Sequence, residues 1–536
     1  FFSARMASSA GEDAMTVVTW DQLAAVKDSL EAQIKELKEQ EGTGFDSGDT
    51  AWILASTCVV LMMSLPGLAL FYGGMTQQKN VLSTVMQTFS IAGLVTVLWL
   101  ILGYSLCFST GSEVYGGVQR GWLIGPDDSQ KLGANTAHAL APSIPEPVFM
   151  TFQLTFAIIT AAIVCGGFAE RMKFSSVVVF IFFWHFLVYC PICHSEWAVD
   201  GFLAAAGDMD FAGGNVVHIS SGVAGLAAGI IVGPRLSGTI TRPHNLIYVC
   251  MGAAFLWVGW FGFNGGSALG ANGTAGMAVM VTQISAATAL LVWIMLEWVT
   301  TGKPSLLGAA SGAVSGLVLI TPGSGYCDQT GSFFTALIGT PIIFLGLKLK
   351  VRLGYDDALD AFGVHGVGGI VGGILTGFFA NPFVTGDDTR KGCFYGNCEQ
   401  VGIQIYAIVV VAGWSFVVSS LILLALKYTM GLRVPESYEI DGLDISEHGE
   451  TMFMDFPAPS DVKVERDIVG TQEENVSGAP VPVPMQPMGA QVPTMFPIPG
   501  VGFNLGYPPN MGVVSSLATP ITQVGPRGSS QPPPGY

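Results

Sequence analysis

The stretch "DFAGGNVVHISSGVAG", residues 210–225, places the ionisable His218 inside a run of apolar and small residues. A second stretch, "DALDAFGVHGVGGIVG", residues 357–372, does the same with His365. An imidazole is expensive in apolar surroundings unless it has a hydrogen-bond partner or a use. In both stretches an Asp lies eight residues before the His, a Val directly precedes it, and a Gly follows after four and again after seven residues. This shared spacing indicates an ancient duplication that contains both histidines.

The composition predicts an all-α polytopic membrane protein. Of 536 residues, 50% are hydrophobic and only 11% are charged, about half the charged fraction of an ordinary soluble protein. The net charge of -17 comes mainly from an acidic N-terminal segment and from the tail beyond Gly431. The part between them is nearly neutral, so we expect it to lie in a lipid bilayer. No segment of the chain is basic enough to bind nucleic acid, so nucleic acid is excluded as a partner.

Apolar segments of about 20 residues, the length needed to cross a membrane, follow one another through the middle of the chain. We predict eleven transmembrane helices, over residues 51–72, 83–108, 148–169, 175–195, 213–233, 247–266, 276–299, 304–321, 332–349, 360–380 and 401–427. The two histidine stretches fall in the fifth and tenth segments, so the duplicated unit holds five. Because five is odd, the copies are inverted in the membrane. The predicted fold is an inverted five-helix repeat, helices 1–5 and 6–10, plus an eleventh helix.

The distribution of Lys and Arg predicts the orientation, since these residues gather in short loops on the inner side. With the N-terminus outside and the soluble N-terminal segment left out, eleven such residues fall in inner loops and the start of the tail and four in outer loops, which favours N-out and C-in. The sequon at Asn272 then lies outside, where glycosylation occurs, whereas the sequon at Asn475 lies inside. Cys393 and Cys398 also lie outside, and the sequence leaves open whether they form a disulfide.

The chain divides into four regions by composition. Residues 1–48 form an extracellular segment with apolar residues at helical spacing among charges, which indicates an exposed amphipathic helix. Residues 49–430 form the eleven-helix domain, residues 431–477 an acidic cytosolic tail, and residues 478–536 a Pro/Gly/Met-rich tail that we expect to be disordered.

The inverted repeat predicts where the two histidines meet. Eight residues of helix rise ~12 Å, so counting inward from opposite faces of a ~30 Å core brings the imidazoles to within roughly 6 Å along the membrane axis. Hydrogen bonding between helices alone would explain one such histidine, but a symmetric pair near the midplane favours a functional site. A metal site is less favoured, because no third ligand falls at the same depth.

Aromatic residues and a hydroxyl at the outer ends of segments three to six narrow the choice of transported species. They are Phe156, Trp197, Phe263 and Ser267. Aromatic faces beside a hydroxyl suit a small cation that is losing water, although each ring alone is more often packing or interfacial belt. No ring of Asp or Glu lines a candidate path, which argues against a metal-cation channel. An apolar path with two imidazoles suits a weak acid that leaves its proton at the entrance, and ammonium is such a species.

Six motifs, two of which overlap the histidine stretches, carry a resemblance to a known family. They are "GDTAWILAST", "PGLALFYGGM", "GGFAERMKF", "DFAGGNVVHI", "WFGFNGGSA" and "DDALDAFGVHGVGGIVGG". Over residues 49–443 the chain resembles the ammonium transporter and methylammonium permease family, of which the Rhesus proteins are more distant relatives. The resemblance implies an eleven-helix subunit of a homotrimer in the plasma membrane, with one pore per subunit that moves ammonium into the cell. Methylammonium is a second expected substrate.

The resemblance also implies roles for individual residues. Trp197, Phe156 and Ser267 would recruit the ammonium ion, with Asp210 organising that end. Phe156 and Phe263 would form the outer gate. His218 and His365 would line the pore, and Asp357 would support it.

The segment "GLRVPESYEIDGLDISEHGETMF", residues 431–453, resembles the cytosolic regulatory tail of the family. Ser446 stands where some members carry a phosphorylated Thr, so cytosolic kinases or other regulators are expected partners. A phosphate there would add negative charge and could undock the tail.

Two other functions compete with ammonium transport. One is an ammonium sensor, or transceptor, whose extensions signal, and the other is a Rhesus-like channel for neutral ammonia. An enzyme is not expected, because no set of nucleophile, base and orienting residue and no metal site is visible. We expect no cofactor.

Overall fold

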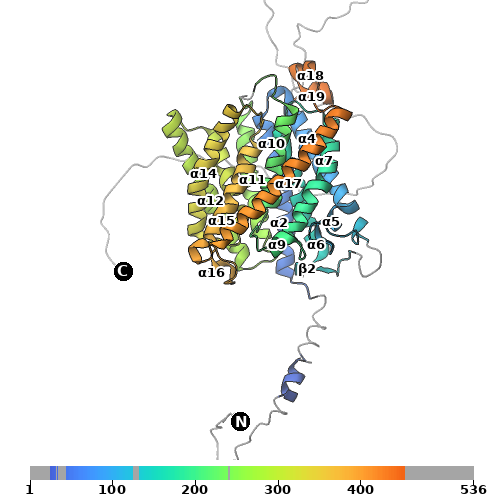
Figure 1. Ribbon diagram of the computed structural model, residues 1–536, viewed down its shortest axis with the longest axis vertical. Helices are drawn as coiled ribbons and strands as arrows, with labels where there is room; N and C mark the ends of the chain where they lie inside the picture. Colours follow the sequence, from blue (N-terminus) through green and yellow to red (C-terminus); the bar gives the residue numbers. More distant parts are fainter. Residues whose placement is uncertain (1–23, 32, 34–43, 125–131, 239–241, 453–536) are drawn as a thin grey trace, which may run out of the picture. The chain divides into compact units, whose positions relative to one another are not determined.

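The computed structural model describes residues 24–31, 33, 44–124, 132–238 and 242–452. In the bundle that begins at Ser47, long helices lie side by side (Figure 1). Within these described ranges, eleven helices are long and apolar enough to cross a membrane, as the sequence predicts.

Several spans are interrupted by short π-helical or 3₁₀ turns. The first five spans consist of α2 (Ser47–Met62), η1 (Met63–Leu68) and α3 (Ala69–Met75); η2 (Gln78–Asn80), α4 (Val81–Leu98), η3 (Trp99–Gly103) and α5 (Tyr104–Phe108); α6 (Glu146–Val164) and η6 (Cys165–Gly167); α7 (Phe174–Trp184), η7 (His185–Tyr189), α8 (Cys190–Trp197) and α9 (Phe202–Ala205); and η8 (Gly214–Ile219) and α10 (Ser220–Val232).

The other six spans are more regular. They consist of α11 (Leu246–Gly266); α12 (Gly273–Thr301); α13 (Leu306–Ile320) and η9 (Thr321–Gly323); α14 (Gln329–Leu353); η10 (Ala361–Gly366) and α15 (Val367–Phe379); and α17 (Glu399–Thr429). Shorter elements occupy the two ends of the bundle: η4 (Gly121–Leu123), the antiparallel strands β1 (Ala137–His138) and β2 (Ala141–Pro145), α16 (Pro382–Thr385), η11 (Cys393–Tyr395), α18 (Glu436–Asp441) and α19 (Leu443–His448).

The predicted duplication is visible in the local structure. The fifth and tenth spans each begin with a six-residue π-helical turn, η8 and η10, and continue as a 13-residue α-helix, α10 and α15. Likewise, the third and eighth spans both end in a three-residue 3₁₀ turn. In Figure 1, α9, which precedes the fifth span, lies at the same end of the bundle as α16, which follows the tenth. The two related spans therefore run in opposite directions.

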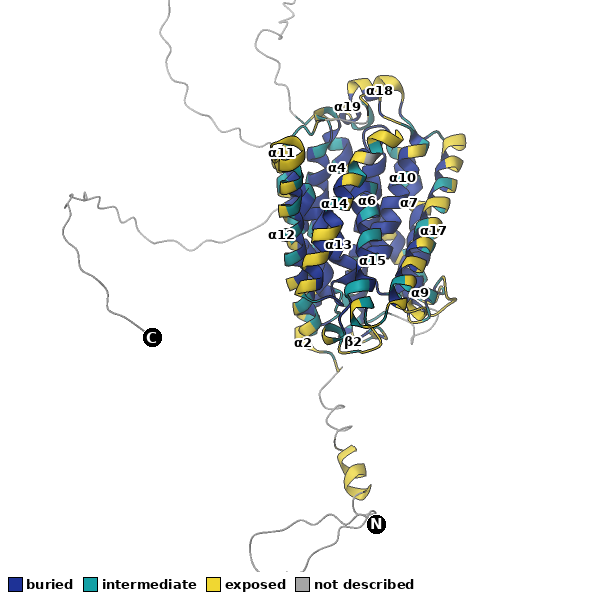
Figure 2. Cartoon of the chain, turned by 60° about the vertical axis from the view of Figure 1, so that its left-hand side comes forward, coloured by how far each residue is buried: buried dark blue, intermediate teal, exposed yellow. Residues whose placement is uncertain are grey.

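The two histidine-bearing spans lie deep in the bundle. In their most apolar parts 83% of the residues of the fifth span and 61% of those of the tenth are buried, against 33% in α12 and 39% in α17. Figure 2 shows this arrangement as a dark interior with exposed residues along the outer helices. The apolar outer faces fit contact with lipid or with another membrane protein chain.

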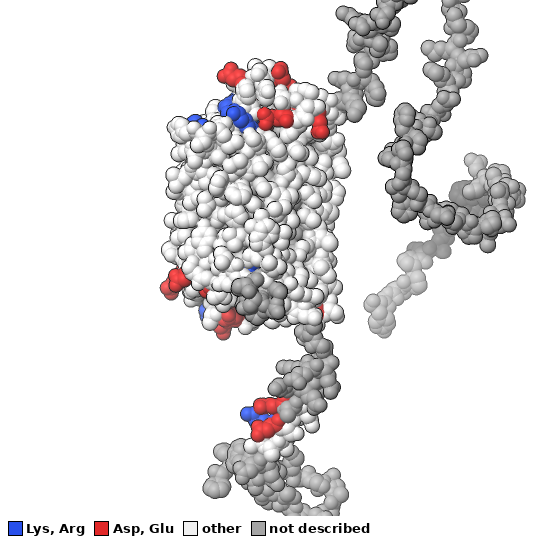
Figure 3. Space-filling view, turned by 90° about the vertical axis from the view of Figure 1, so that its right-hand side faces the viewer, with Lys and Arg blue, Asp and Glu red and all other residues white. Residues whose placement is uncertain are grey.

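Charged residues gather at the two ends of the bundle. Figure 3 shows Lys, Arg, Asp and Glu above and below a broad uncharged belt. Burying a charge in hydrocarbon is costly, so this belt marks the part of the surface that suits the bilayer.

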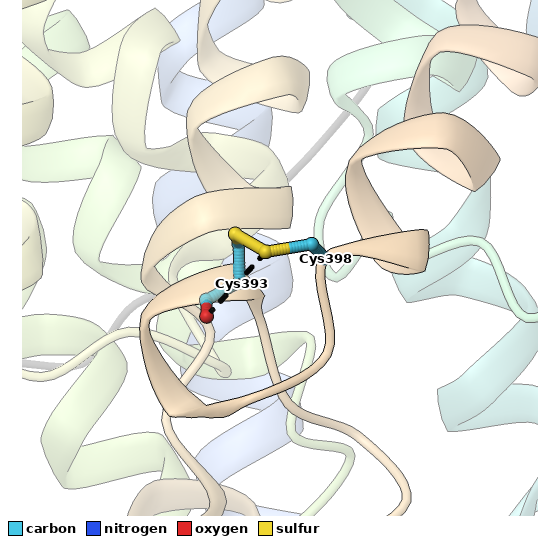
Figure 4. Close-up of a disulfide and its surroundings, with 2 residues drawn as sticks. All are labelled: Cys393 and Cys398. Atoms are coloured by element: carbon cyan, nitrogen blue, oxygen red, sulfur yellow. Dashed lines mark hydrogen bonds between the residues drawn. A yellow bond between two sulfur atoms is a disulfide. The ribbon is translucent and has the colours of Figure 1, made fainter.

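Two expectations outside the bundle can also be compared with the structure. Residues 24–31 are helical and exposed, as predicted, and Lys27 pairs with Glu31 at 3.7 Å along this helix. Cys393 and Cys398, which the sequence left open, are joined by a disulfide just before α17 (Figure 4). The sequon at Asn475 and the Pro/Gly/Met-rich tail lie outside the described residues.

Candidate functional site

The two predicted histidines meet in the middle of the bundle. Nδ1 of His218 and Nδ1 of His365 are 3.2 Å apart, and the ring centroids are 5.2 Å apart. One Nδ1 must donate and the other accept, so the two rings have complementary protonation at this atom. Nε2 of His218 is buried and has no hydrogen-bond partner among the described residues. It is therefore available to a molecule that passes.

A narrow, almost wholly apolar cavity contains the pair. His218 and His365 are its only ionisable lining residues among those described. The remaining lining residues are Met63, Leu68, Phe71, Ile159, Ile163, Val217, Leu256, Trp260, Phe263 and Val314. A bare cation would lose its hydration shell here with little compensation, whereas a small neutral molecule with hydrogen-bonding capacity would be accommodated.

A stack of aromatic rings joins this cavity to the end of the bundle where α2 begins and α11 ends. Phe156 of α6 stacks on Phe263 of α11, with centroids 4.3 Å apart, and Phe263 lies 6.1 Å from the His218 ring. Trp197 of α8 contacts Phe156 edge-on at 5.6 Å. The rings that the sequence assigned to recruitment and gating therefore form a continuous series leading to the histidines.

Ser267, the predicted hydroxyl of the recruitment site, lies one turn beyond Phe263 at the end of α11. Its Oγ donates a hydrogen bond to the Phe263 carbonyl oxygen at 2.8 Å. The hydroxyl oxygen retains lone pairs that can accept from an N–H donor. The Trp197 ring is held by its Nε1, which donates to the Asp210 carbonyl oxygen at 2.9 Å.

Asp210 and Asp357 act on the backbone at the starts of the two pore helices. The Asp210 carboxylate accepts hydrogen bonds from the N–H groups of residues 213–216. The Asp357 carboxylate accepts from those of residues 361–363. These N–H groups have no partners within their own helices, and a carboxylate satisfies them. Each Asp therefore fixes the turn that carries a histidine.

Burial raises the pKa of both aspartates, and hydrogen bonds from the backbone N–H groups partly offset that effect. The pKa of Asp357, which also lies near Lys350 and Asp360, rises to about 6.

The residue three positions after each aspartate has a positive φ. Gly213 has φ 108°, and its counterpart Asp360 has φ 60°. At Gly213 a Cβ would lie 2.6 Å from a Val217 methyl, so only glycine fits the turn. Asp360 pairs with Lys350 of α14. The two copies therefore reach the same backbone turn with different residues.

The glycines of the repeat allow the two pore helices to touch through their backbones. A Cβ on Gly222 would lie 2.3 Å from the Gly366 nitrogen, and one on Gly369 would lie 2.9 Å from the Gly214 carbonyl oxygen. Gly225 faces Ala361 of η10, whose Cβ would be 3.3 Å from an added one, and η6 behind it, whereas Gly372 faces the Leu319 carbonyl oxygen of α13. Small residues at these positions set the close approach of the two imidazoles.

The tail docks against the end of the bundle opposite the aromatic residues. Asp444 of α19 accepts from the backbone N–H groups of Leu82 and Ser83 at 3.1 and 2.7 Å, at the start of α4. Glu447 accepts from the Phe174 N–H at 2.9 Å, at the start of α7. Ser446 lies between these two residues on α19 and is partly buried. The predicted phosphorylation site thus belongs to the helix that caps two spans.

Two further features complete the comparison with the sequence-based expectations. Asn272, the predicted glycosylation site, is exposed at the start of α12. Its Oδ1 accepts from the Ala275 N–H at 3.0 Å, and its Nδ2 takes no part in that bond.

Trp260, whose ring stacks on His218 at 5.5 Å, was not predicted. Its position three residues before Phe263 on the same helix was the available signal.

No group of three or more His, Cys, Asp or Glu side chains in the described part of the chain could hold a metal ion.

Comparison with known proteins gives one consistent family. Residues 51–453 match the model of the Ammonium Transporter Family. An ammonium transporter of Bacillus subtilis is 44% identical over 409 residues, which are 76% of this chain and 99% of the relative. Ammonium transporter 1 of Schizosaccharomyces pombe is 39% identical and covers 76% of this chain and 83% of its own length.

Solved structures agree with these sequence matches. Candida albicans Mep2 superimposes with a TM-score of 0.69 at 34% identity, covering 75% of this chain and 88% of its own. A structure described as a sensor Amt protein has a TM-score of 0.68 at 28% identity, covering 75% of this chain and 98% of its own.

Proposed function

The chain belongs to the ammonium transporter family and transports ammonium across a membrane, and from this premise we propose that Phe156, Phe263, His218 and His365 form its conduction path. The observation that supports this path most directly is the unbroken series of rings from Trp197 to His365. It joins the aromatic end of the bundle to a cavity that is apolar except for two imidazoles.

The ammonium ion is recruited by the faces of Trp197 and Phe156 and by the Ser267 hydroxyl oxygen. Aromatic faces attract a cation, and the Ser267 oxygen can accept one of its N–H groups because the hydroxyl proton is directed to the Phe263 carbonyl. Asp210 contributes indirectly. Its backbone carbonyl oxygen holds the Trp197 ring. Its carboxylate accepts hydrogen bonds from backbone N–H groups and so fixes the start of η8.

The ion loses a proton before it passes the Phe156 and Phe263 rings, because the cavity beyond them offers a cation almost no polar contact. Ammonia then passes His218 and His365, whose nitrogens supply hydrogen bonds. The proton either remains outside or moves along the imidazole pair. Asp357 supports this path by capping η10.

The protein acts in the plasma membrane with its N-terminus outside, carries ammonium inward as a homotrimer, and accepts methylammonium as an analogue. A trimer is supported by the broad apolar faces of the peripheral helices, such as α12, where Val299 is 86% exposed. The outside placement also makes Asn272 a glycosylation site.

Growth of a strain that lacks its own ammonium transporters tests the proposed function. Expression of the full chain is expected to restore growth on low ammonium, and His218→Ala to abolish the rescue. Wild-type protein that reaches the cell surface without restoring growth would contradict the proposal. Substrate-dependent current in proteoliposomes then separates the two fates of the proton, because only a relayed proton carries charge.

Phosphorylation of Ser446 regulates the path in this proposal. A phosphate there lies on the same short helix as Asp444 and Glu447 and repels both, which weakens the caps on α4 and α7. Ser446→Asp is expected to change the uptake rate at equal surface expression, with Ser446→Ala as the control. Equal rates in all three proteins would rule the site out.

The similarity to a sensor Amt protein favours a second candidate function, an ammonium sensor. A sensor keeps signalling when the path is blocked, so downstream signalling is measured in His218→Ala and in a tail truncation. A third candidate is a Rhesus-like channel for neutral ammonia, which would show no current and little preference for ammonium over methylamine.

A further inference from the structure

Two carboxyl groups and one amide meet beneath the predicted recruitment site. Nδ2 of Asn215 donates to Oε1 of Glu196 at 2.8 Å and to Oδ2 of Asp208 at 3.0 Å. Because one nitrogen contacts both carboxyl groups, Glu196 and Asp208 lie next to each other. We call these three residues the acidic cluster. The spacing of residues in the sequence gave no indication of it, since α8, the loop after α9 and η8 each contribute one member.

Two oxygen atoms of the acidic cluster have no donor. Oδ1 of Asn215, whose side chain is 4% exposed, and Oδ1 of Asp208 are both buried and unpartnered among the described residues. The Asn215 amide is held in the cluster by its other atom, so its Oδ1 lies there as well. Buried acceptors without a donor are unfavourable. The cluster therefore lacks a group that donates several hydrogen bonds.

The pair of carboxyl groups carries one shared proton when nothing else is bound. Two buried carboxylates this close to each other cannot both ionise easily, so one of them holds a proton. Burial, together with the nearby Asp210, raises the pKa of Asp208 to about 8. A cation that replaces this proton would leave the charge of the cluster unchanged.

The acidic cluster shares its scaffold with the outer aromatic site. Glu196 directly precedes Trp197 in α8, and the backbone N–H of Asn215 donates to the Asp210 carboxylate at 2.8 Å. The Trp197 ring is held by the carbonyl of the same Asp210. Of the three members, only Asp208 is partly exposed as a residue, so outer water comes nearest to the cluster there.

We propose that Glu196, Asp208 and Asn215 form a second cation site, which takes up one ammonium ion in exchange for the proton shared by the carboxyl groups and supplies that ion to the aromatic site. This inference rests on the proposed function. Ammonium offers four N–H donors, enough for the two unpartnered oxygens and both carboxylates. The displaced proton leaves through Asp208 to outer water, and a proton returns when the ion moves on, so charge balances at each step.

Other titratable groups near the cluster do not neutralise it. Asp210 lies on the same loop, and its carboxylate is occupied by backbone N–H groups. Tyr326, from the segment between η9 and α14, lies near Asp208, and the exposed Arg390 nearby pairs with Asp387 at 3.8 Å. From α17 the neutral Gln400 and Gln404 contact the loop backbone.

Uptake kinetics of the full chain test the proposal. Glu196→Gln and Asp208→Asn keep the shape of each side chain and remove its charge. Each is expected to raise the half-saturating ammonium concentration by about tenfold, the effect of one lost charge-assisted hydrogen bond, with an unchanged maximal rate. Glu113→Gln, which removes an exposed carboxylate on an outer loop, serves as the control and is expected to leave both constants unchanged.

The pH dependence gives an independent readout. Because the cation competes with the shared proton, the half-saturating concentration of the wild type is expected to fall as the outer pH rises toward about 8. In Asp208→Asn this dependence is expected to be lost. An unchanged half-saturating concentration in both variants, the same pH dependence as the wild type, or a reduced maximal rate alone would overturn the proposal.

A binding measurement covers the case in which transport is lost. In purified Trp197→Leu protein the aromatic site is disabled, and ammonium chloride is expected to raise the Tm more than sodium chloride does. Adding Asp208→Asn should remove this difference. Its absence in Trp197→Leu alone would contradict a second site. Failure of the wild type to transport would instead count against the proposed function, and the binding result would still stand on its own.

Discussion

At the scale of single residues, the site depends on a few polar atoms placed in apolar surroundings. His218 and His365 satisfy each other through Nδ1, and their remaining polarity faces a cavity with no other ionisable lining residue in the described part of the chain. Asp210 and Asp357 never need to meet the substrate, because their carboxylates are occupied by the backbone. The residues in the path and those that position it are thus different.

His218→Ala is expected to lower ammonium uptake by at least about tenfold. The substitution removes the free Nε2 and leaves Nδ1 of His365 without its partner, which costs about 1–3 kcal/mol for a buried polar group. Initial uptake rates at equal surface expression measure the effect. His244→Gln, in the loop before α11, is the matched control and should transport like the wild type. Normal uptake by His218→Ala would exclude the pair from the path.

Asp357→Ala is expected to destabilise the fold by about 1–2 kcal/mol, and Asp357→Asn by less, because the amide oxygen can still accept from the helix start. Thermal unfolding of purified protein compares the two with the wild type. The pKa of Asp357 is about 6 in the folded state and about 4 when unfolded. The folded state therefore holds the proton more tightly, and the carboxyl's contribution is largest below pH ~4.

The stability of the wild type relative to Asp357→Asn should thus fall as the pH rises from about 4 to about 6. A difference that grows over this range would show that the carboxylate form is the favoured one in the folded protein.

At the scale of elements, the sequence predicted much of the architecture. Hydropathy located all eleven spans, and the repeated Asp, His and Gly spacing placed the two imidazoles together, because both signals depend on residue type along one helix. The fourth segment was expected to end at residue 195, and the span continues through α9 to Ala205. The capping role of the aspartates and the stacking of Trp260 were missed, since they depend on loop conformation and on neighbouring helices.

Gly222→Ala is expected to disrupt the crossing of the two pore helices. The added Cβ would lie 2.3 Å from a backbone nitrogen of Gly366, which has no side chain to move aside. Both the Tm and the uptake rate should fall, because Gly366 directly follows His365. Gly413→Ala in α17 is the matched control: nothing lies within 4 Å of its added Cβ, and helix propensity makes the change neutral or slightly stabilising. Equal behaviour of the two variants would contradict the close packing.

At the scale of the whole molecule, the odd number of spans predicts that the two ends of the chain lie on opposite sides of the membrane. The first span follows the N-terminal segment and the last leads into α18 and α19 at the other end (Figure 1). The aromatic residues and the docked tail therefore act on different compartments.

Glycosylation reports this orientation directly. When the protein is made in a eukaryotic cell, Asn272→Gln is expected to abolish a glycosidase-sensitive mobility shift, and Asn475→Gln to leave the shift in place. A shift that depends on Asn475 would require the opposite orientation. Protease treatment of intact cells checks the same point, since a C-terminal tag should be protected.

The contact between Gly222 and Gly366 also limits how transport can be controlled. Where two backbones touch, no rotamer change can separate the helices, so the distance between the two helices that carry the histidines is a fixed property of the fold. Adjustable resistance to flow must then come from side chains, such as the rings of Phe156 and Phe263, or from the docked helix α19. The central segment sets which molecules can pass, and the two ends set how often they do.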